Sequence, residues 1–158
     1  MRKSIIVPEA PKPAGPYAHA VVANGFVFVA GQGPQIPETG IVPDNFKEQV
    51  RQTLKNIQAI LRSVGCSMRD VIKVNAYLTD PTRFAEYNEV YNEFFDENLP
   101  VRTTVQAGLI KILVEIDCVA VLPDETKLRR LRRRVRDATR SGTSASPASR
   151  PSNDDARD

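Results

Sequence analysis

The chain has 158 residues, of which 41% are hydrophobic and 26% charged, and its formal net charge is +3. This length is typical of one globular domain, and the composition excludes a disordered polyelectrolyte. No apolar run reaches the ~20 residues of a membrane span, and no signal peptide is recognisable, so we expect a cytoplasmic protein. Two separated cysteines and a single histidine exclude zinc fingers, disulfide scaffolds and histidine-dependent triads.

Charge divides the chain into two parts. Residues 1–123 hold 12 Lys and Arg against 13 Asp and Glu, whereas residues 124–158 hold 10 against 6. Seven of these later cations lie between Lys127 and Arg136, and a Ser/Thr/Pro/Ala/Asp-rich segment typical of disorder follows. We therefore expect a domain over 1–123 and a disordered tail over 124–158. The basic block is either a solvated extension or a site for nucleic acid or an anionic surface.

The first elements in chain order are strands. Ser4–Val7 predicts a short one, and Val21-Val22 and Phe26–Ala30 flank the dipeptide Asn24-Gly25. These two turn residues tolerate positive φ, which indicates a tight β-hairpin.

Two helices with a strand between them follow. Apolar residues recur at three- and four-residue spacing from Asp44 to Val64, and Gly65 suits the carboxyl end of that helix. Val71–Thr79 alternates as a strand does, and Asp80-Pro81 opens a second helix to about Asn98. This alternation places Ile72, Val74, Ala76 and Leu78 together on one face of the strand.

Two β-rich segments, Arg102–Gln106 and Ile112–Leu122, complete the domain. The order β-β-β-α-β-α-β-β predicts an α+β fold in which two helices cover one face of a mixed sheet. Along the last strand, the residues that face away from the helices are too apolar for open water and too charged for a core. They are Leu113, Glu115, Asp117, Val119 and Val121. We infer that another subunit covers this face, with Glu115 at or near the interface.

Candidate chemistry lies in the last two strands. Strand alternation places Arg102, Thr104 and Gln106 on one face, where a guanidinium fork beside a hydroxyl suits a carboxylate. The alternative is a structural salt bridge for Arg102, because isolated arginines are common. Glu115 alone could likewise be a structural or solvated carboxylate.

Five short motifs occur together in the order and approximate spacing of one known family. They are Gly15-Pro16-Tyr17, Ala30-Gly31-Gln32-Gly33-Pro34, Tyr87-Asn88, Pro100-Val101-Arg102 and Val114-Glu115-Ile116. In these motifs the chain resembles the RidA (YjgF) family over about residues 1–122. The resemblance implies a chorismate-mutase-like fold and a homotrimer with clefts between subunits. For the arginine-bearing branch it also implies hydrolysis of 2-imino and 2-enamino acids to 2-keto acids and ammonia.

The resemblance also implies roles for individual residues. Arg102 would grip the substrate carboxylate in a bidentate pair, and Glu115 would hold and activate the attacking water. No cofactor or metal is expected, since an imine carbon is already electrophilic. The stretch between Arg102 and Glu115 is a couple of residues shorter than in close relatives, which leaves the register of Glu115 open.

Four further residues complete the expected binding site. Backbone donors around Gly31 would bind the carboxylate, Tyr17 would form a wall from the neighbouring subunit, and Asn88 would shape the cleft. Thr104 stands where many members have cysteine, so it keeps a small polar group there without a thiol.

Two other functions stay open at this point. The first is a non-catalytic member that binds carboxylate metabolites or, through the basic tail, a macromolecule. The second is a deaminase dedicated to one catabolic substrate, such as 2-aminomuconate.

Overall fold

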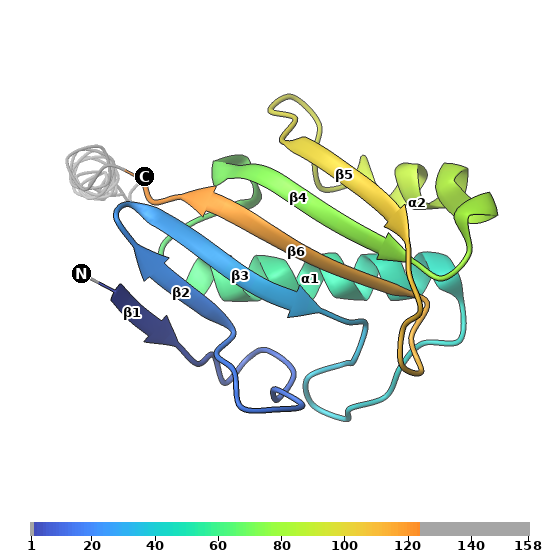
Figure 1. The fold of residues 1–158 in the computed structure, drawn as a ribbon, viewed down its shortest axis with the longest axis horizontal. Helices are drawn as coiled ribbons and strands as arrows, with labels where there is room; N and C mark the ends of the chain where they lie inside the picture. The colour runs from blue at the N-terminus through green and yellow to red at the C-terminus, as the bar shows by residue number, and fades with distance from the viewer. Residues whose placement is uncertain (1, 124–158) are drawn as a thin grey trace, which may run out of the picture. The chain divides into compact units, whose positions relative to one another are not determined.

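Six strands form one mixed sheet in the computed structural model, which describes residues 2–123 (Figure 1). The strands are β1 (Arg2–Ile5), β2 (Ala20–Ala23), β3 (Phe26–Gln32), β4 (Val71–Leu78), β5 (Val101–Gln106) and β6 (Val114–Val121). Their order in the sheet is β1-β2-β3-β6-β4-β5, and only β4 and β5 are parallel neighbours. The predicted tail over 124–158 lies outside the described residues.

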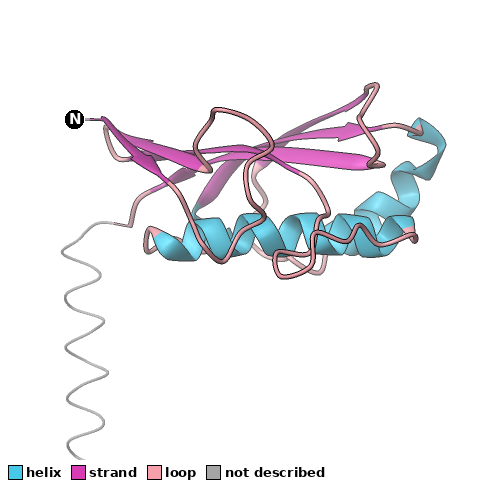
Figure 2. Cartoon of the chain, turned by 90° about the horizontal axis from the view of Figure 1, so that it is seen from below, coloured by secondary structure: helices cyan, strands magenta, loops and turns pink. Residues whose placement is uncertain are grey.

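Both α-helices lie on the same side of this sheet. They are α1 (Phe46–Ser63) and α2 (Phe84–Tyr91), and Figure 2 shows them below the strands with the other face uncovered. Two 3₁₀ turns, Met68–Asp70 and Pro81–Arg83, precede β4 and α2. The α+β architecture predicted from the sequence is confirmed. Within residues 2–123, neither helix combines the length and apolarity needed to cross a bilayer.

Local signals explain where these elements turn and end. Asn24 and Gly25 have φ of 50° and 82°, the backbone that a tight hairpin between β2 and β3 requires. The Asn45 side chain accepts a hydrogen bond from the Glu48 backbone N–H at 3.3 Å and so caps α1. At the other end Gly65 has φ 81°, and its N–H donates to the Arg62 carbonyl.

The core lies between α1 and the sheet. Val50, Leu54 and Ile57 of α1 are buried against the inward face of β6, as the three- and four-residue spacing predicted. Cys118 lies on that inward face and is 2% exposed. Both cysteines are free thiols, and burial raises the pKa of Cys118 to about 12.

Two sequence predictions are wrong in detail. The second helix ends at Tyr91 rather than near Asn98, because Glu93 and Phe94 donate to carbonyls three residues back and tighten the chain. Ile72 does not share the buried face of Val74 and is 44% exposed, because the pairing of β4 with β6 shifts register between Val71 and Lys73. This bulge places Val71 in the core instead.

Candidate functional site

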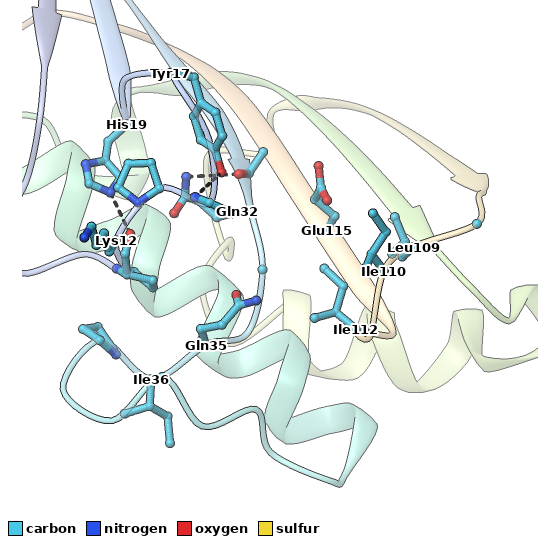
Figure 3. Close-up of a pocket in the computed structure, with 18 residues that line it drawn as sticks. Lys12, Tyr17, His19, Gln32, Gln35, Ile36, Leu109, Ile110, Ile112 and Glu115 are labelled. Carbon is cyan, nitrogen blue, oxygen red and sulfur yellow. Dashed lines mark hydrogen bonds between the residues drawn. The ribbon is translucent and has the colours of Figure 1, made fainter.

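A cavity of about 740 Å³ opens where the amino-terminal segment meets β3 and the start of β6 (Figure 3). Three of the six predicted site residues, Tyr17, Gly31 and Glu115, line it. Its wall also includes Gln35, and the apolar side chain of Ile112. The structure therefore brings together half of the predicted site, from elements separated by up to about a hundred residues of chain.

The segment that carries Tyr17 is held by His19. The His19 side chain is 2% exposed, its Nδ1 accepts from the Val7 N–H at 2.9 Å, and its Nε2 lies 2.8 Å from the Pro11 carbonyl oxygen. Tyr17 is 47% exposed, and its hydroxyl accepts from the Ala14 N–H at 3.1 Å. The sequence analysis assigned His19 no structural role. A lone histidine close to a Gly-Pro turn could have indicated a side chain that fixes the turn through backbone hydrogen bonds.

Gly31 permits a close approach between β3 and the Glu115 side chain. A Cβ at Gly31 would lie 3.0 Å from Glu115 Cδ and still closer to a carboxylate oxygen, so any other residue would displace the carboxylate. The pairing of β3 with β6 shifts register between Val29 and Gln32 at this place. The Gln32 amide also donates to the Ala30 and Gly31 carbonyls at 3.1 and 3.2 Å.

Glu115 is half-buried, and its electrostatic surroundings favour the protonated form. Burial raises the pKa of this carboxyl, and the nearby charge of Asp117 raises it further. Asp117 is held in place by the Asn75 amide at 2.8 Å and the Tyr77 hydroxyl at 3.1 Å. A carboxyl with a raised pKa accepts a proton more readily than an exposed one, which suits a general base.

Arg102 is surrounded by uncharged groups. Its Nη2 donates to Asn88 Oδ1 at 2.8 Å, and its guanidinium carbon lies 4.5, 5.1 and 5.5 Å from the ring centroids of Tyr91, Tyr87 and Phe84. None of the ion pairs within residues 2–123 includes Arg102. The structural salt bridge considered from the sequence is therefore not present in this part of the chain.

Three hydroxyl groups around Arg102 have no hydrogen-bond partner among the described residues. They belong to Tyr87, Tyr91 and Thr104, and all three oxygen atoms are buried. Burial raises the pKa of Tyr91 to about 12 and that of Tyr87 above its usual range, so both phenols stay protonated at neutral pH. A hollow of about 290 Å³ adjoins Thr104 and Phe84.

The six predicted residues thus form two groups that do not meet in one chain. Arg102 pairs with Val74 in the sheet and faces the helices, whereas Glu115 pairs with Tyr77 on the opposite face. We call the first set, Arg102, Asn88 and Thr104, the Arg102 group. The second set, Glu115, Gly31 and Tyr17, is the Glu115 group.

No metal cluster is found in the part of the chain that the structure describes: no three His, Cys, Asp or Glu side chains gather closely enough. The single histidine has both ring nitrogens engaged with backbone groups. The arrangement can bind an anion at Arg102 and exchange a proton at Glu115.

The chain matches a protein-family model described as Endoribonuclease L-PSP over residues 7–122. It is 47% identical over 123 residues to a RutC family protein of Pyrococcus horikoshii, covering 76% of this chain and 98% of that protein. The chain belongs to the RidA (YjgF) family. Among solved structures, RidA from an Antarctic Psychrobacter superposes with a TM-score of 0.74 at 37% identity, covering 76% of this chain and 99% of that one.

A relative with a functional name is TdcF of Escherichia coli K12, which is designated a candidate reactive intermediate deaminase. It is 39% identical over 126 residues, covering 77% of this chain and 98% of that protein. A crystal structure of E. coli TdcF with bound serine gives a TM-score of 0.73 at 38% identity, covering 77% and 99%. Deaminase activity on reactive intermediates is therefore supported for this RidA family member at the level of the family.

Proposed function

We propose that this RidA family protein hydrolyses 2-imino and 2-enamino acids derived from amino acids to 2-keto acids and ammonia. The observation that carries the proposal is the guanidinium of Arg102, which Asn88 and three aromatic rings hold without a carboxylate partner among residues 2–123. A fixed cation with unused donors is a receptor for a carboxylate, and every 2-imino acid carries one. Together with the cytoplasmic location expected from the sequence, this suits clearance of reactive imines.

Arg102 would bind the substrate through two parallel N–H···O bonds. Asn88 occupies one N–H of the guanidinium, which leaves the remaining donors of the fork for the carboxylate. The buried hydroxyl of Thr104 lies on the same face of β5 and would donate to the same anion.

Glu115 would act as the general base. As it takes a proton from water, the water oxygen attacks the imine carbon, and the imine nitrogen takes up a proton. In the resulting carbinolamine the hydroxyl gives up its proton as the carbon–oxygen bond becomes a carbonyl. The amino nitrogen takes up a proton, the carbon–nitrogen bond breaks, and ammonia leaves. Gly31 brings the β3 backbone next to this carboxylate, and Tyr17 would form one wall of the site.

The proposal needs a second copy of the chain, because Arg102 and Glu115 lie on opposite faces of one sheet. On the face opposite the helices, five large apolar side chains are between 39% and 66% exposed: Phe26, Phe28, Val101, Val105 and Val121. Such a surface favours burial against another subunit. The resemblance to the RidA family implies that this assembly is a homotrimer. We propose that in it the Arg102 group of one subunit completes the site with the Glu115 group of its neighbour.

A coupled assay tests the activity. An L-amino acid oxidase generates the imine, semicarbazide traps it, and the protein competes by producing the 2-keto acid. We expect Arg102→Ala to lose about 100-fold or more of this activity. Arg69→Ala is the matched control, since Arg69 is exposed and outside both groups.

A folded wild-type protein that leaves semicarbazone formation unchanged for small, branched and aromatic imines would exclude general imine hydrolysis. A deaminase dedicated to one substrate, such as 2-aminomuconate, or a non-catalytic carboxylate binder would then be the next candidates. Binding through the basic tail concerns residues outside those described, and deletion of 124–158 tests it.

A further inference from the structure

One face of α2 is directed at a single guanidinium. Phe84, Tyr87, Asn88 and Tyr91 recur at the i, i+3, i+4 and i+7 spacing that places side chains on one side of a helix. All four contact Arg102: the three rings lie within 5.5 Å of its guanidinium carbon, and Asn88 accepts its hydrogen bond.

These contacts constrain the guanidinium in different ways. The negative face of an aromatic ring attracts a cation and restricts the plane in which a guanidinium lies. Tyr87 and Tyr91 are 0% and 4% exposed, so water does not weaken this attraction at their rings. Phe84 forms the rim and stays 45% exposed.

The helix that carries the rings is itself held against α1. Lys47 and Arg51 of α1 pair with Glu89 of α2 and with Glu93 just beyond it. Arg83, directly before α2, stacks 4.4 Å from the Phe46 ring centroid. The two ion pairs after Asn88 and the cation–π contact before it hold the ring-bearing face of α2 in place against α1.

We propose that Phe84, Tyr87 and Tyr91 form an aromatic cradle that positions the Arg102 guanidinium for the substrate carboxylate. The inference rests on the proposed function, and it makes these three positioning residues rather than catalytic ones. A long arginine side chain that is already ordered loses less conformational entropy when it binds. Since the carboxylate contact is the same before and during the reaction, the cradle acts on substrate affinity rather than on kcat.

The test compares ring removal with hydroxyl removal. Tyr87→Leu and Tyr91→Leu are expected to raise KM about tenfold with kcat within about threefold of wild type. Binding of 2-oxobutanoate, a carboxylate-bearing product measured by calorimetry, should weaken by the same factor. Tyr87→Phe and Tyr91→Phe keep the rings and should stay within about threefold of wild type in both measurements.

Two further variants separate positioning from folding. Phe95→Leu is the matched control, because this buried ring stacks 4.4 Å from the Tyr91 centroid and is not one of the three rings around the Arg102 guanidinium. Phe84→Leu changes a half-exposed ring, so it should fold even where the tyrosine variants do not. It should raise KM about threefold.

The outcomes are distinct. The cradle is excluded if Phe84→Leu and the folded leucine variants match Phe95→Leu in KM and 2-oxobutanoate binding. Tyr→Phe variants that weaken 2-oxobutanoate binding and raise KM as much as the Tyr→Leu variants would also overturn the cradle, since the hydroxyls and not the rings would then position the guanidinium. A wild-type protein that neither binds 2-oxobutanoate nor hydrolyses imines removes the proposed function and the cradle with it.

Discussion

The guanidinium of Arg102 lies on the helix-covered face of the sheet among aromatic rings, whereas the carboxylate of Glu115 lies on the opposite face beside a glycine backbone. One helix, α2, supplies the three rings and the amide that contact the first. The second depends on three segments, namely the Tyr17 turn, the bulged end of β3, and β6. The comparison teaches that packing orients the Arg102 guanidinium, whereas close backbone approach positions the Glu115 carboxylate.

The largest effect is expected at Glu115. Replacement by Gln keeps the shape of the side chain but removes the base, so kcat should fall about 10²–10⁴-fold with little change in KM. Steady-state kinetics in the coupled assay measure this, with Glu38→Gln on an exposed loop as the control. A fall in affinity with kcat preserved would instead assign Glu115 to binding.

Arg102→Lys tests whether the fork, and not only the charge, is required. An ammonium cannot lie flat on the rings or bind a carboxylate through two parallel bonds, so we expect kcat/KM to fall about 10–100-fold. Arg69→Lys controls for the exchange itself. Wild-type activity in Arg102→Lys would mean that a point charge is sufficient.

Gly31→Ala disturbs the Glu115 group without altering a polar residue. The added Cβ would displace the Glu115 carboxylate, and we expect kcat to fall about tenfold, in line with the sensitivity of catalysis to small displacements. Gly108 lines the same cavity, and a Cβ added there would meet nothing within 4 Å. Gly108→Ala should therefore leave kcat unchanged. Equal effects of the two substitutions would contradict the close-approach argument.

The pH profile probes the charge beside the base. Because burial and Asp117 raise the pKa of Glu115, activity should decline with falling pH at a midpoint above the ordinary 4.5. Asp117→Asn removes one of the two causes and should move the midpoint to lower pH. Asp44→Asn, at an exposed position far along the chain, should not. An unchanged midpoint in Asp117→Asn would show that burial alone raises the pKa of Glu115.

The smallest effect concerns stability. The pKa of Glu115 is higher in the folded protein than in the unfolded chain. Ionised Glu115 therefore lowers the free energy of unfolding above that pKa and has no effect on it below the pKa of the unfolded chain. Glu115→Gln should therefore raise the free energy of unfolding slightly at pH 7 and leave it unchanged near pH 3. Thermal unfolding at both pH values measures the difference. Stabilisation at pH 3 alone would contradict a raised pKa of Glu115 in the folded state.

Most elements of the fold could be predicted from sequence patterns. The spacing of apolar residues from Asp44 to Val64 and the Asn24-Gly25 turn predicted α1 and the β2–β3 hairpin, because periodicity and positive φ are local properties. The bulge that exposes Ile72 was missed because it depends on the pairing of β4 with β6. The early end of α2 was missed because the tighter hydrogen bonds of Glu93 and Phe94 leave no signal in the spacing of apolar residues. The aromatic setting of Arg102 was not predicted, because helical spacing does not reveal what a helix face packs against.

By itself, the sequence determined the family and the α+β class, and it singled out Arg102 and Glu115 as candidate site residues. Those properties reside in residue types and their spacing along the chain. Only the tertiary structure decided that Arg102 lies in an aromatic setting without a carboxylate partner among residues 2–123, and that Glu115 lies on the other face of the sheet. Which face a side chain occupies depends on strand pairing and register, and these form between segments far apart in sequence.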